Sequence, residues 1–172
     1  TLQKREPNFK ILSEISSECF MPLSYGGGIK SFDDAKKIFS IGFEKIVINN
    51  SAICNPKLIT EIANYSGSQS IIISVDIKRN MFGNYSIYSN NGTKKISLKL
   101  IYWIKMLEDL GAGELLVTSI DRDGTWGGFD IEIMKKISDS VNIPVIANGG
   151  AGDISHISKI INETNISAVC LG

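Results

Sequence analysis

Short apolar runs recur along this chain between segments with helical periodicity. The intervening segments place apolar residues three and four positions apart, which is typical of helices that bury one face. Strands that alternate with helices in this way predict a parallel sheet covered by helices. The strands are predicted in six runs rich in Ile, Val and Leu, at residues 21–25, 45–49, 70–76, 114–119, 143–147 and 167–171.

Four helices can be placed between these runs. Ser31 followed by Asp34 predicts a capped helix start, with an inward stripe at Ala35, Ile38, Phe39 and Ile41. Asn55 is expected to cap the next helix, with Pro56 at its first position and with Leu58, Ile59 and Ile62 buried. Two further helices are expected at about residues 98–110 and 130–140, the former ending at Gly111.

Two stretches of the chain, residues 11–50 and 133–172, align without a gap. Each consists of a helix, a proline, an apolar strand, a glycine pair and a second helix. The glycine pairs are Gly27–Gly28 and Gly149–Gly150. Bare backbone amides at a helix N-terminus form a phosphate site, so two such units predict a ligand with two phosphates. The alternative is that both pairs are ordinary strand-to-helix turns.

Polar residues follow nearly every predicted strand, among them Asn49, Asp76 and Asp123. This distribution favours a closed barrel over an open sheet, where such residues gather at one switch point. The longest gap between strands contains residues 84–95, which predict a small β-hairpin with its turn at Asn91-Gly92. With about six units, the prediction is an α/β fold, a parallel βα barrel forming one domain over residues 1–172.

Asp76 is the leading acid/base candidate, because a carboxylate that ends a buried strand faces the barrel mouth. The alternative is an Asp that caps the following loop. Asp121 and Asp123 resemble the start of a calcium loop, but the later acidic ligand is missing, so no metal is predicted. The only histidine, His156, is expected on a helix surface rather than in a nucleophilic system.

The net charge is zero and the basic residues are scattered, which argues against nucleic-acid and membrane-surface partners. No run of eighteen apolar residues occurs, and the first six residues lack the features of a signal peptide, so a cytoplasmic protein is expected. Cys19, Cys54 and Cys170 have no metal-like spacing and are expected to be buried free thiols.

Several motifs together resemble the cyclase subunit of imidazole glycerol phosphate synthase, a (βα)8 barrel family of histidine biosynthesis. They are Gly26-Gly-Gly-Ile, Glu44-Lys45 through Asn49, Asn55-Pro56, Gly67-Ser-Gln, Asp76-Ile-Lys-Arg, Gly111-Ala-Gly-Glu, Ser119-Ile-Asp-Arg-Asp-Gly-Thr, and Ile143-Pro through Asn148-Gly-Gly-Ala-Gly. The resemblance implies an enzyme that closes an imidazole ring and splits a phosphoribulosyl aminoimidazole carboxamide compound. It implies no cofactor, and ammonia supplied by a glutaminase partner in a heterodimer.

The resemblance also implies roles for individual residues. Asp76 falls on one of two catalytic aspartates. Lys45 and Glu114 fall on two positions of an ammonia gate; without the resemblance, they are expected only to be solvated charges at the starts of strands. Glu44 falls where the family contacts the glutaminase. Substrate and phosphate binding is implied for Gly27, Gly28, Asn49, Thr118, Asp123, Gly124, Gly149 and Gly150.

The chain departs from the family pattern in two ways. The first two strands have no counterpart, and with them go the other catalytic aspartate and the remaining gate residues; the chain also stops at Gly172, before the final helix and part of the second phosphate site. An incomplete (βα)8 barrel, either a fragment of a longer barrel or the product of an incomplete gene, is therefore expected. Ser24-Tyr25 stands where histidine-pathway members have a smaller Thr-Val pair. That feature resembles paralogues that use glutaminase-derived ammonia to make acetamidino sugars for surface polysaccharide. A third alternative is an inert chain that binds only phosphate or a partner.

Overall fold

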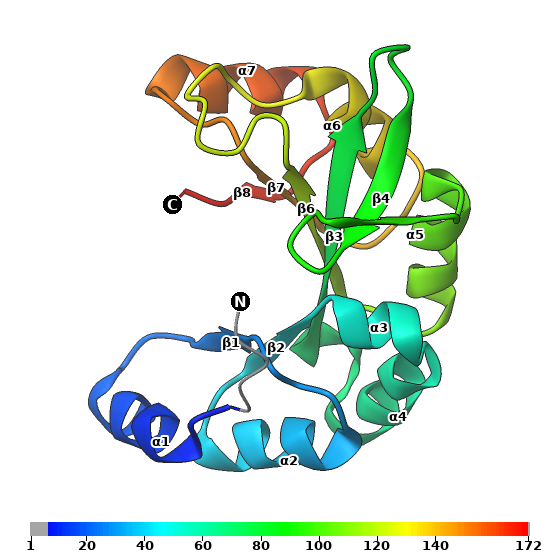
Figure 1. Cartoon of the computed structure of the whole chain (residues 1–172). Helices are drawn as coiled ribbons and strands as arrows, with labels where there is room; N and C mark the ends of the chain where they lie inside the picture. The colour runs from blue at the N-terminus through cyan, green and yellow to red at the C-terminus, as the bar shows by residue number, and fades with distance from the viewer. Residues whose placement is uncertain (1–6, 172) are drawn as a thin grey trace.

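The computed structural model describes residues 7–171 (Figure 1). The expectations that concern the first six residues and Gly172 lie outside this range. The helices are α1 (Phe9–Glu18), α2 (Phe32–Ile41), α3 (Asn50–Cys54), α4 (Lys57–Ser66), α5 (Leu100–Asp109), α6 (Ile131–Ser138) and α7 (Ile154–Glu163), with a 3₁₀ turn η1 (Ser68–Ser70). The strands are β1 (Ser24–Gly26), β2 (Lys45–Ile48), β3 (Ile71–Arg79), β4 (Tyr85–Ser89), β5 (Lys94–Ile96), β6 (Glu114–Ser119), β7 (Val145–Asn148) and β8 (Ala168–Val169).

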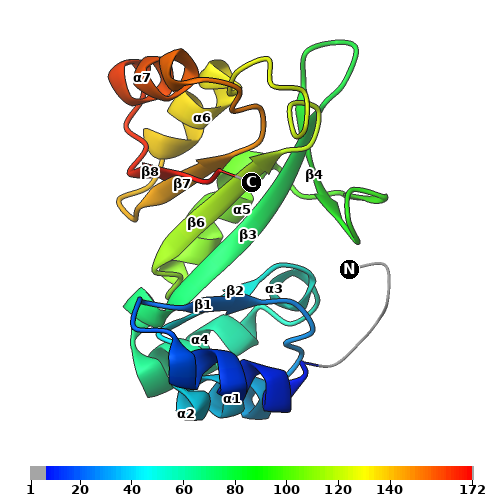
Figure 2. The ribbon, with the colours of Figure 1, turned by 90° about the vertical axis from the view of Figure 1, so that its left-hand side faces the viewer.

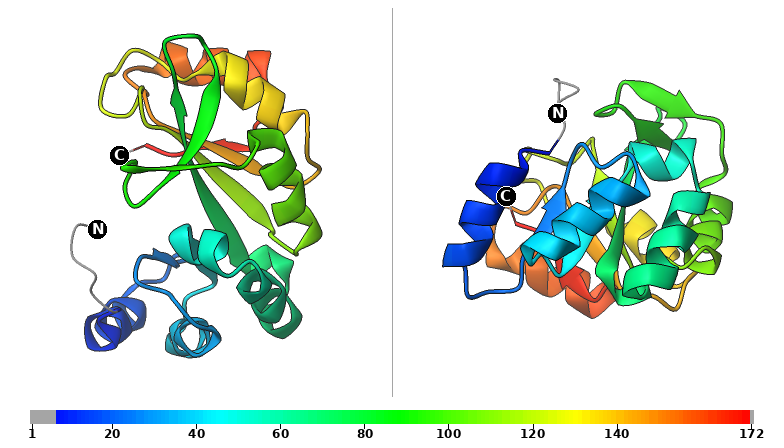
Figure 3. Two further views of the ribbon diagram at one scale, coloured as in Figure 1. Left: turned by 45° about the vertical axis from the view of Figure 1, so that its right-hand side comes forward. Right: turned by 90° about the horizontal axis from the view of Figure 1, so that it is seen from below.

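Six strands form one parallel sheet in the order β1-β2-β3-β6-β7-β8. Each strand pairs with the next of the six along the chain, as in a (βα) barrel. The sheet curves into an arc, and the helices lie along its outer side (Figures 1 and 3). Strands β1 and β8 are the two ends of this order. The predicted incomplete parallel barrel is therefore confirmed.

The predicted hairpin is also confirmed. Strands β4 and β5 are antiparallel and join at a turn in which Asn90, Asn91 and Gly92 have positive φ. Strand β4 also pairs with the end of β3, from Asp76 to Arg79. This pairing carries β3 three residues past its predicted end, and Figure 2 shows it as the long strand of the sheet.

The main core lies between the helices and the outer face of the sheet. Buried and half-buried residues alternate in β2 and β6, so one face of each strand is sealed and the other is partly open. Burying one isoleucine contributes about 1.5–3 kcal/mol, so the sealed face holds the arc together. Its fully buried large side chains include Ile38, Ile46, Ile48, Ile62, Ile73 and Trp103.

Two local expectations, on one helix start and on the cysteines, are wrong. Pro56 rather than Asn55 is the N-cap of α4, because the chain first forms the short, unpredicted α3, and no side chain caps α4. Cys54 and Cys170 are exposed and Cys19 is partly exposed, so the thiols are not buried. Cys54 ends α3, and Cys170 follows strand β8 at one end of the strand order.

Candidate active site

Three polar side chains lie in one row at the carboxyl ends of adjacent strands. Asp76 in β3 is in register with Thr118 in β6, and Thr118 is in register with Asn148 in β7. In-register residues of parallel strands point to the same face. This is the half-buried inner face, because the neighbouring residues Val75, Val117 and Ala147 are buried on the helix side. The Asn148 Nδ2 donates to Thr118 Oγ1 at 3.1 Å, which fixes the row.

Asp76 is held by a second amide from the neighbouring strand. The Nδ2 of Asn49, which follows β2, donates to Asp76 Oδ2 at 3.1 Å and lies 3.4 Å from Ser74 Oγ. Burial raises the pKa of Asp76; hydrogen bonds from Asn49 and Ser74 lower it, and the Asp123 carboxylate raises it again. The net shift is upward. Asp76 therefore holds a proton more readily than an exposed aspartate does.

Two of these partners were not singled out from the sequence as site residues. Ser74 stands two positions before Asp76 in a strand, which places both side chains on the same face. That spacing could have identified it. Asn148 was noted at the end of its strand, but its bond to Thr118 depends on the pairing of β6 with β7.

Both glycine pairs form turns that few other residues could adopt. Gly27 and Gly28 have φ of 113° and 73°, and Gly149 and Gly150 have φ of 95° and 101°. These values favour glycine strongly. Among residues 7–171, no turn or loop hydrogen bond uses the backbone N–H of any of the four glycines. The amides are therefore available to a ligand.

The helices that follow the two turns are partly capped, so fewer of their N–H groups are free than predicted. Ser31 and Asp34 form a capping box at the start of α2, in which Ser31 Oγ accepts from Asp34 N–H. Asp153 caps α7 by accepting from the backbone N–H groups of Ser155 and His156, at 2.6 and 3.3 Å. These side chains satisfy some of the N–H groups that a phosphate at a helix start would use.

The loop after β6 brings the remaining predicted polar residues near this row. Asp121 Oδ2 accepts from the backbone N–H of Arg79 at 2.6 Å, which joins the loop to β3. Asp123 is exposed, and its backbone N–H donates to Ser119 O at 2.9 Å. Gly124 has φ of 72° with open space around it. Asp123 is the member of this loop whose charge acts on Asp76.

At the opposite ends of the strands, Lys45 and Glu114 form an ion pair. Lys45 begins β2 and Glu114 begins β6, so the pair spans the intervening strand β3. Both side chains are mostly covered, with 32% and 18% of their surface exposed. Glu44 is exposed and makes no ion pair with any residue in the described range.

Comparison with known proteins decides the family. The model of the histidine biosynthesis protein family matches residues 1–172. The chain belongs to this family.

Curated relatives in the family agree with this assignment. The chain is 44% identical over 168 residues to "Putative imidazole glycerol phosphate synthase subunit hisF2" of Pseudomonas aeruginosa, covering 98% of this chain and 67% of that protein. It is 46% identical over 169 residues to "Putative imidazole glycerol phosphate synthase subunit HisF" of Leptospira borgpetersenii, with 98% and 66% covered. "Imidazole glycerol phosphate synthase subunit HisF" of Alkaliphilus metalliredigens is 44% identical over 158 residues, with 92% and 63% covered. The chain thus spans about two thirds of the length of these relatives.

The pair Ser24-Tyr25 suggested a different substrate, but Tyr25 does not face the row of Asp76, whereas Ser24 is in register with Lys45 on the inner face. Tyr25 is in register with Ile46, whose side chain is fully buried on the helix side of the sheet. The Tyr25 ring packs edge-on against Phe43, with 5.9 Å between ring centroids. Its size therefore affects the outer core and gives no direct evidence about the substrate.

Residues 7–171 contain neither a metal-binding cluster nor a membrane-spanning helix. There is no group of three or more His, Cys, Asp or Glu side chains in this range that is placed to hold a metal ion. No helix within this range is both long enough and apolar enough to cross a membrane.

Proposed function

We propose that this chain carries the ammonia-dependent cyclase/lyase chemistry of imidazole glycerol phosphate synthase. The substrate is the phosphoribulosyl aminoimidazole carboxamide compound, and the products are imidazole glycerol phosphate and aminoimidazole carboxamide ribotide. The family assignment and the names of the relatives support the reaction class. The observation that carries the proposal is the row of Asp76, Thr118 and Asn148 on the inner face, with a glycine turn after β1 and another after β7.

Asp76 acts as the acid/base group in this proposal. Ring closure requires protons to move between nitrogen and oxygen atoms, and a carboxylate whose pKa is raised above its usual value can both accept and donate them. Asn49 Nδ2 holds one carboxylate oxygen at 3.1 Å, which leaves the other oxygen for substrate. Asp123 lies close enough to act on the Asp76 charge and is assigned to substrate binding with Thr118 and Gly124.

The two glycine turns bind the two phosphates of the substrate. Gly27–Gly28 and Gly149–Gly150 follow strands β1 and β7, which lie on opposite sides of β3, the strand of Asp76. Free backbone N–H groups in left-handed turns form anion-binding concavities. A substrate with a phosphate at each end is thereby positioned across the Asp76 row, and such positioning lowers the barrier to ring closure.

Ammonia reaches this row from a glutaminase partner at the other end of the strands. The Lys45–Glu114 ion pair lies there on the inner face and is assigned to the gate. Glu44, exposed beside Lys45, is assigned to the glutaminase contact. The same proposal places the reaction in the cytoplasm and requires no metal ion or cofactor.

The test is ammonia-dependent turnover of this substrate by the wild-type protein and by Asp76→Asn. We expect turnover to fall by about 10²–10⁴-fold, the usual contribution of a general acid/base. Asp109→Asn, on the exposed last turn of α5, is the matched control and should keep full activity. Because the fold raises the pKa of Asp76 and so favours its neutral form, the neutral amide in Asp76→Asn should not lower the melting temperature. Undiminished turnover by Asp76→Asn would refute the role.

The same assay separates the alternatives. Turnover of a nucleotide-linked amino sugar in place of the aminoimidazole substrate would assign the chain to the acetamidino-sugar paralogues. Phosphate binding without turnover of either substrate would leave the chain as a binding protein only.

A further inference from the structure

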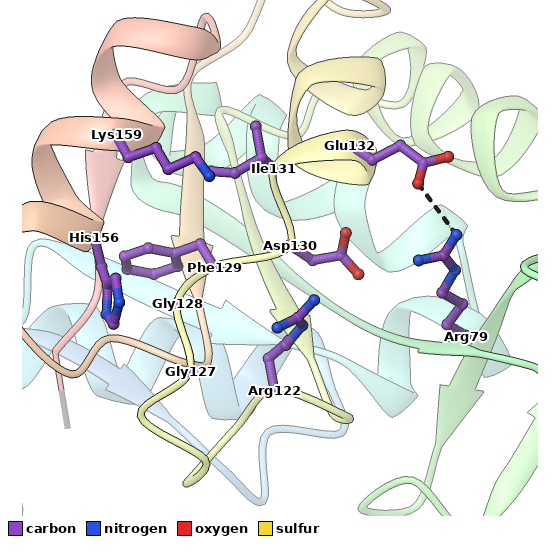
Figure 4. Close-up of a pocket in the computed structure, with 10 residues that line it drawn as sticks. All are labelled: Arg79, Arg122, Gly127, Gly128, Phe129, Asp130, Ile131, Glu132, His156 and Lys159. Carbon is purple, nitrogen blue, oxygen red and sulfur yellow. Dashed lines mark ion pairs between the residues drawn. The ribbon is translucent and has the colours of Figure 1, made fainter.

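A pocket of about 360 Å³ lies outside the Asp76 row, between the loop after β6, the start of α6, helix α7 and the end of β3 (Figure 4). Asp76, Asn49, Thr118 and the four turn glycines do not line it. Its wall carries three basic side chains, two carboxylates, a histidine, two glycines and two apolar residues. The lining residues are Arg79, Arg122, Gly127, Gly128, Phe129, Asp130, Ile131, Glu132, His156 and Lys159.

Two cations in this pocket have no partner. The side chains of Arg122 and Lys159 make no hydrogen bond or ion pair with any residue from 7 to 171. Arg122 comes from the loop after β6 and Lys159 from α7, and Figure 4 shows both beside the same space. Arg122 is half-buried and Lys159 is exposed, and two unpaired cations that line one pocket favour an anion there.

The two carboxylates of the pocket are already engaged. The Tyr85 hydroxyl donates to Asp130 and lies 2.9 Å from each of its carboxylate oxygens. Burial, followed by the hydrogen bond to Asp130, raises the pKa of Tyr85, which keeps it a donor. Glu132 is paired with Arg79, with 3.3 Å between Oε2 and Nη2. Arg79 and Glu132 cancel, and Asp130 keeps its negative charge because the Tyr85 hydroxyl is a neutral donor. Arg122 and Lys159 therefore leave the pocket with a formal charge of +1.

The backbone of the pocket adds further donors. Since Asp130 is turned toward Tyr85, no side chain caps the start of α6. Lys159 and Ile131, the first residue of that helix, line the same pocket, and Glu132 in the first turn of the helix is paired with Arg79 (Figure 4). His156 Nδ1 accepts from the backbone N–H of Gly152 at 3.1 Å, so the neutral ring carries its proton on Nε2, as a donor.

We propose that this pocket binds the phosphoryl group of a small phosphorylated metabolite. Arg122 and Lys159 supply the charge, and Phe129 and Ile131 supply apolar wall for a short organic body. The volume is near the lower end of the range for small-molecule sites, which suits a compact monoester rather than a dinucleotide. The site is separate from the substrate phosphate sites, but Gly128 N–H donates to Gly150 O at 2.7 Å, so its ligand contacts the loop that supports the second turn.

The test is a titration of ¹⁵N-labelled protein with inorganic phosphate at constant ionic strength, followed by NMR at the backbone amides of Gly127, Gly128 and Ile131. We expect saturable shifts at these amides, with a Kd about tenfold weaker in Lys159→Gln because one charge-assisted contact is lost. Lys136→Gln removes the same charge from the exposed face of α6, away from the pocket, and should match the wild type.

Equal Kd values for Lys159→Gln and Lys136→Gln, or shifts that rise linearly without saturation, would overturn the proposal. The amides of the four turn glycines report on the substrate phosphate sites in the same spectra. Loss of binding at one set of amides is thus distinguishable from loss at the other.

Discussion

The two copies of the repeated unit contain the same elements, but they support their glycine turns differently. Helices α2 and α7 have equal lengths and equivalent positions in the repeat. A Cβ added to Gly27, in the first turn, would meet no atom within 4 Å. In the second turn, a Cβ added to Gly149, the counterpart of Gly27, would lie 2.7 Å from the carbonyl oxygen of Ser119. One added to Gly150 would lie 2.3 Å from that of Gly128.

This difference shows that glycine is required in the two turns for different physical reasons. In the first copy, glycine is required by the backbone conformation alone, because space around it is open. In the second copy, the loop after β6 packs directly against the turn, so a side chain is also excluded by contact. The first turn is free to adapt to a ligand, whereas the second is held in place by its neighbours.

The largest effect is expected for Gly150→Ala. The added methyl group meets backbone atoms, which cannot move as a flexible side chain can, and the alanine must adopt a left-handed conformation. We expect a loss of about 3–5 kcal/mol in the free energy of unfolding, comparable to other severe packing defects. Urea unfolding followed by circular dichroism measures it. A loss below that of Gly27→Ala would contradict the packing argument.

A smaller effect is expected for Gly27→Ala. Only the positive φ is unfavourable there, so the loss should be about 1–2 kcal/mol. Comparison with Gly150→Ala in the same urea series isolates the contribution of contact from that of conformation. Equal losses for the two variants would mean that the surroundings of the turns do not matter.

Much of this comparison could be predicted from the sequence. The ungapped repeat predicted both strand-turn-helix units, and Ser31 is the N-cap of α2 as its capping signal indicates. That same signal, Ser31 with Asp34, showed that the Asp34 amide is occupied, although the helix amides were predicted to be bare. The contact between Gly150 and Gly128 could not be predicted, because it depends on how a distant loop folds back.

Other features of the site were only partly predictable. Asp76 was identified because it is a polar residue at the end of an apolar run, and its half-buried side chain in the sheet agrees with that position. The extension of β3 to Arg79 was missed because it depends on pairing with β4. The pocket of Arg122 and Lys159 combines residues from separate elements, and no local pattern marks it.

A third, smaller loss of stability is expected when the N-terminal cap of α2 is removed. Ser31→Ala removes the side-chain acceptor for Asp34 N–H, and we expect a loss of about 1 kcal/mol, typical of a lost N-cap. Ser40→Ala, on the exposed end of the same helix, serves as the control. If both variants unfold at the same urea concentration as the wild type, α2 does not depend on its cap.

The smallest effect is expected in the pH dependence of stability. Partial burial raises the pKa of Asp34, but hydrogen bonds from Lys30 and Ser31 outweigh it and hold that pKa below its usual value. Hydrogen bonds from Ser155 lower the pKa of Asp153. A folded-state pKa below the unfolded one stabilises the fold above the unfolded pKa, and this contribution is lost as the pH falls through the folded pKa.

We therefore expect Asp34→Asn and Asp153→Asn each to flatten the loss of stability below about pH 4, the usual aspartate pKa. Thermal unfolding between neutral and acidic pH measures this slope. Asp109→Asn should leave the slope as in the wild type, because Asp109 is exposed and caps nothing. An unchanged slope in both cap variants would show that the carboxylates do not stabilise the two helices.

The most direct test of the account is a crystal structure with the bisphosphorylated substrate bound. The account predicts one phosphate at the amides of Gly27 and Gly28, the other at those of Gly149 and Gly150, and the body of the molecule against Asp76. Electron density that leaves both turns empty, or that places the substrate away from Asp76, would contradict it.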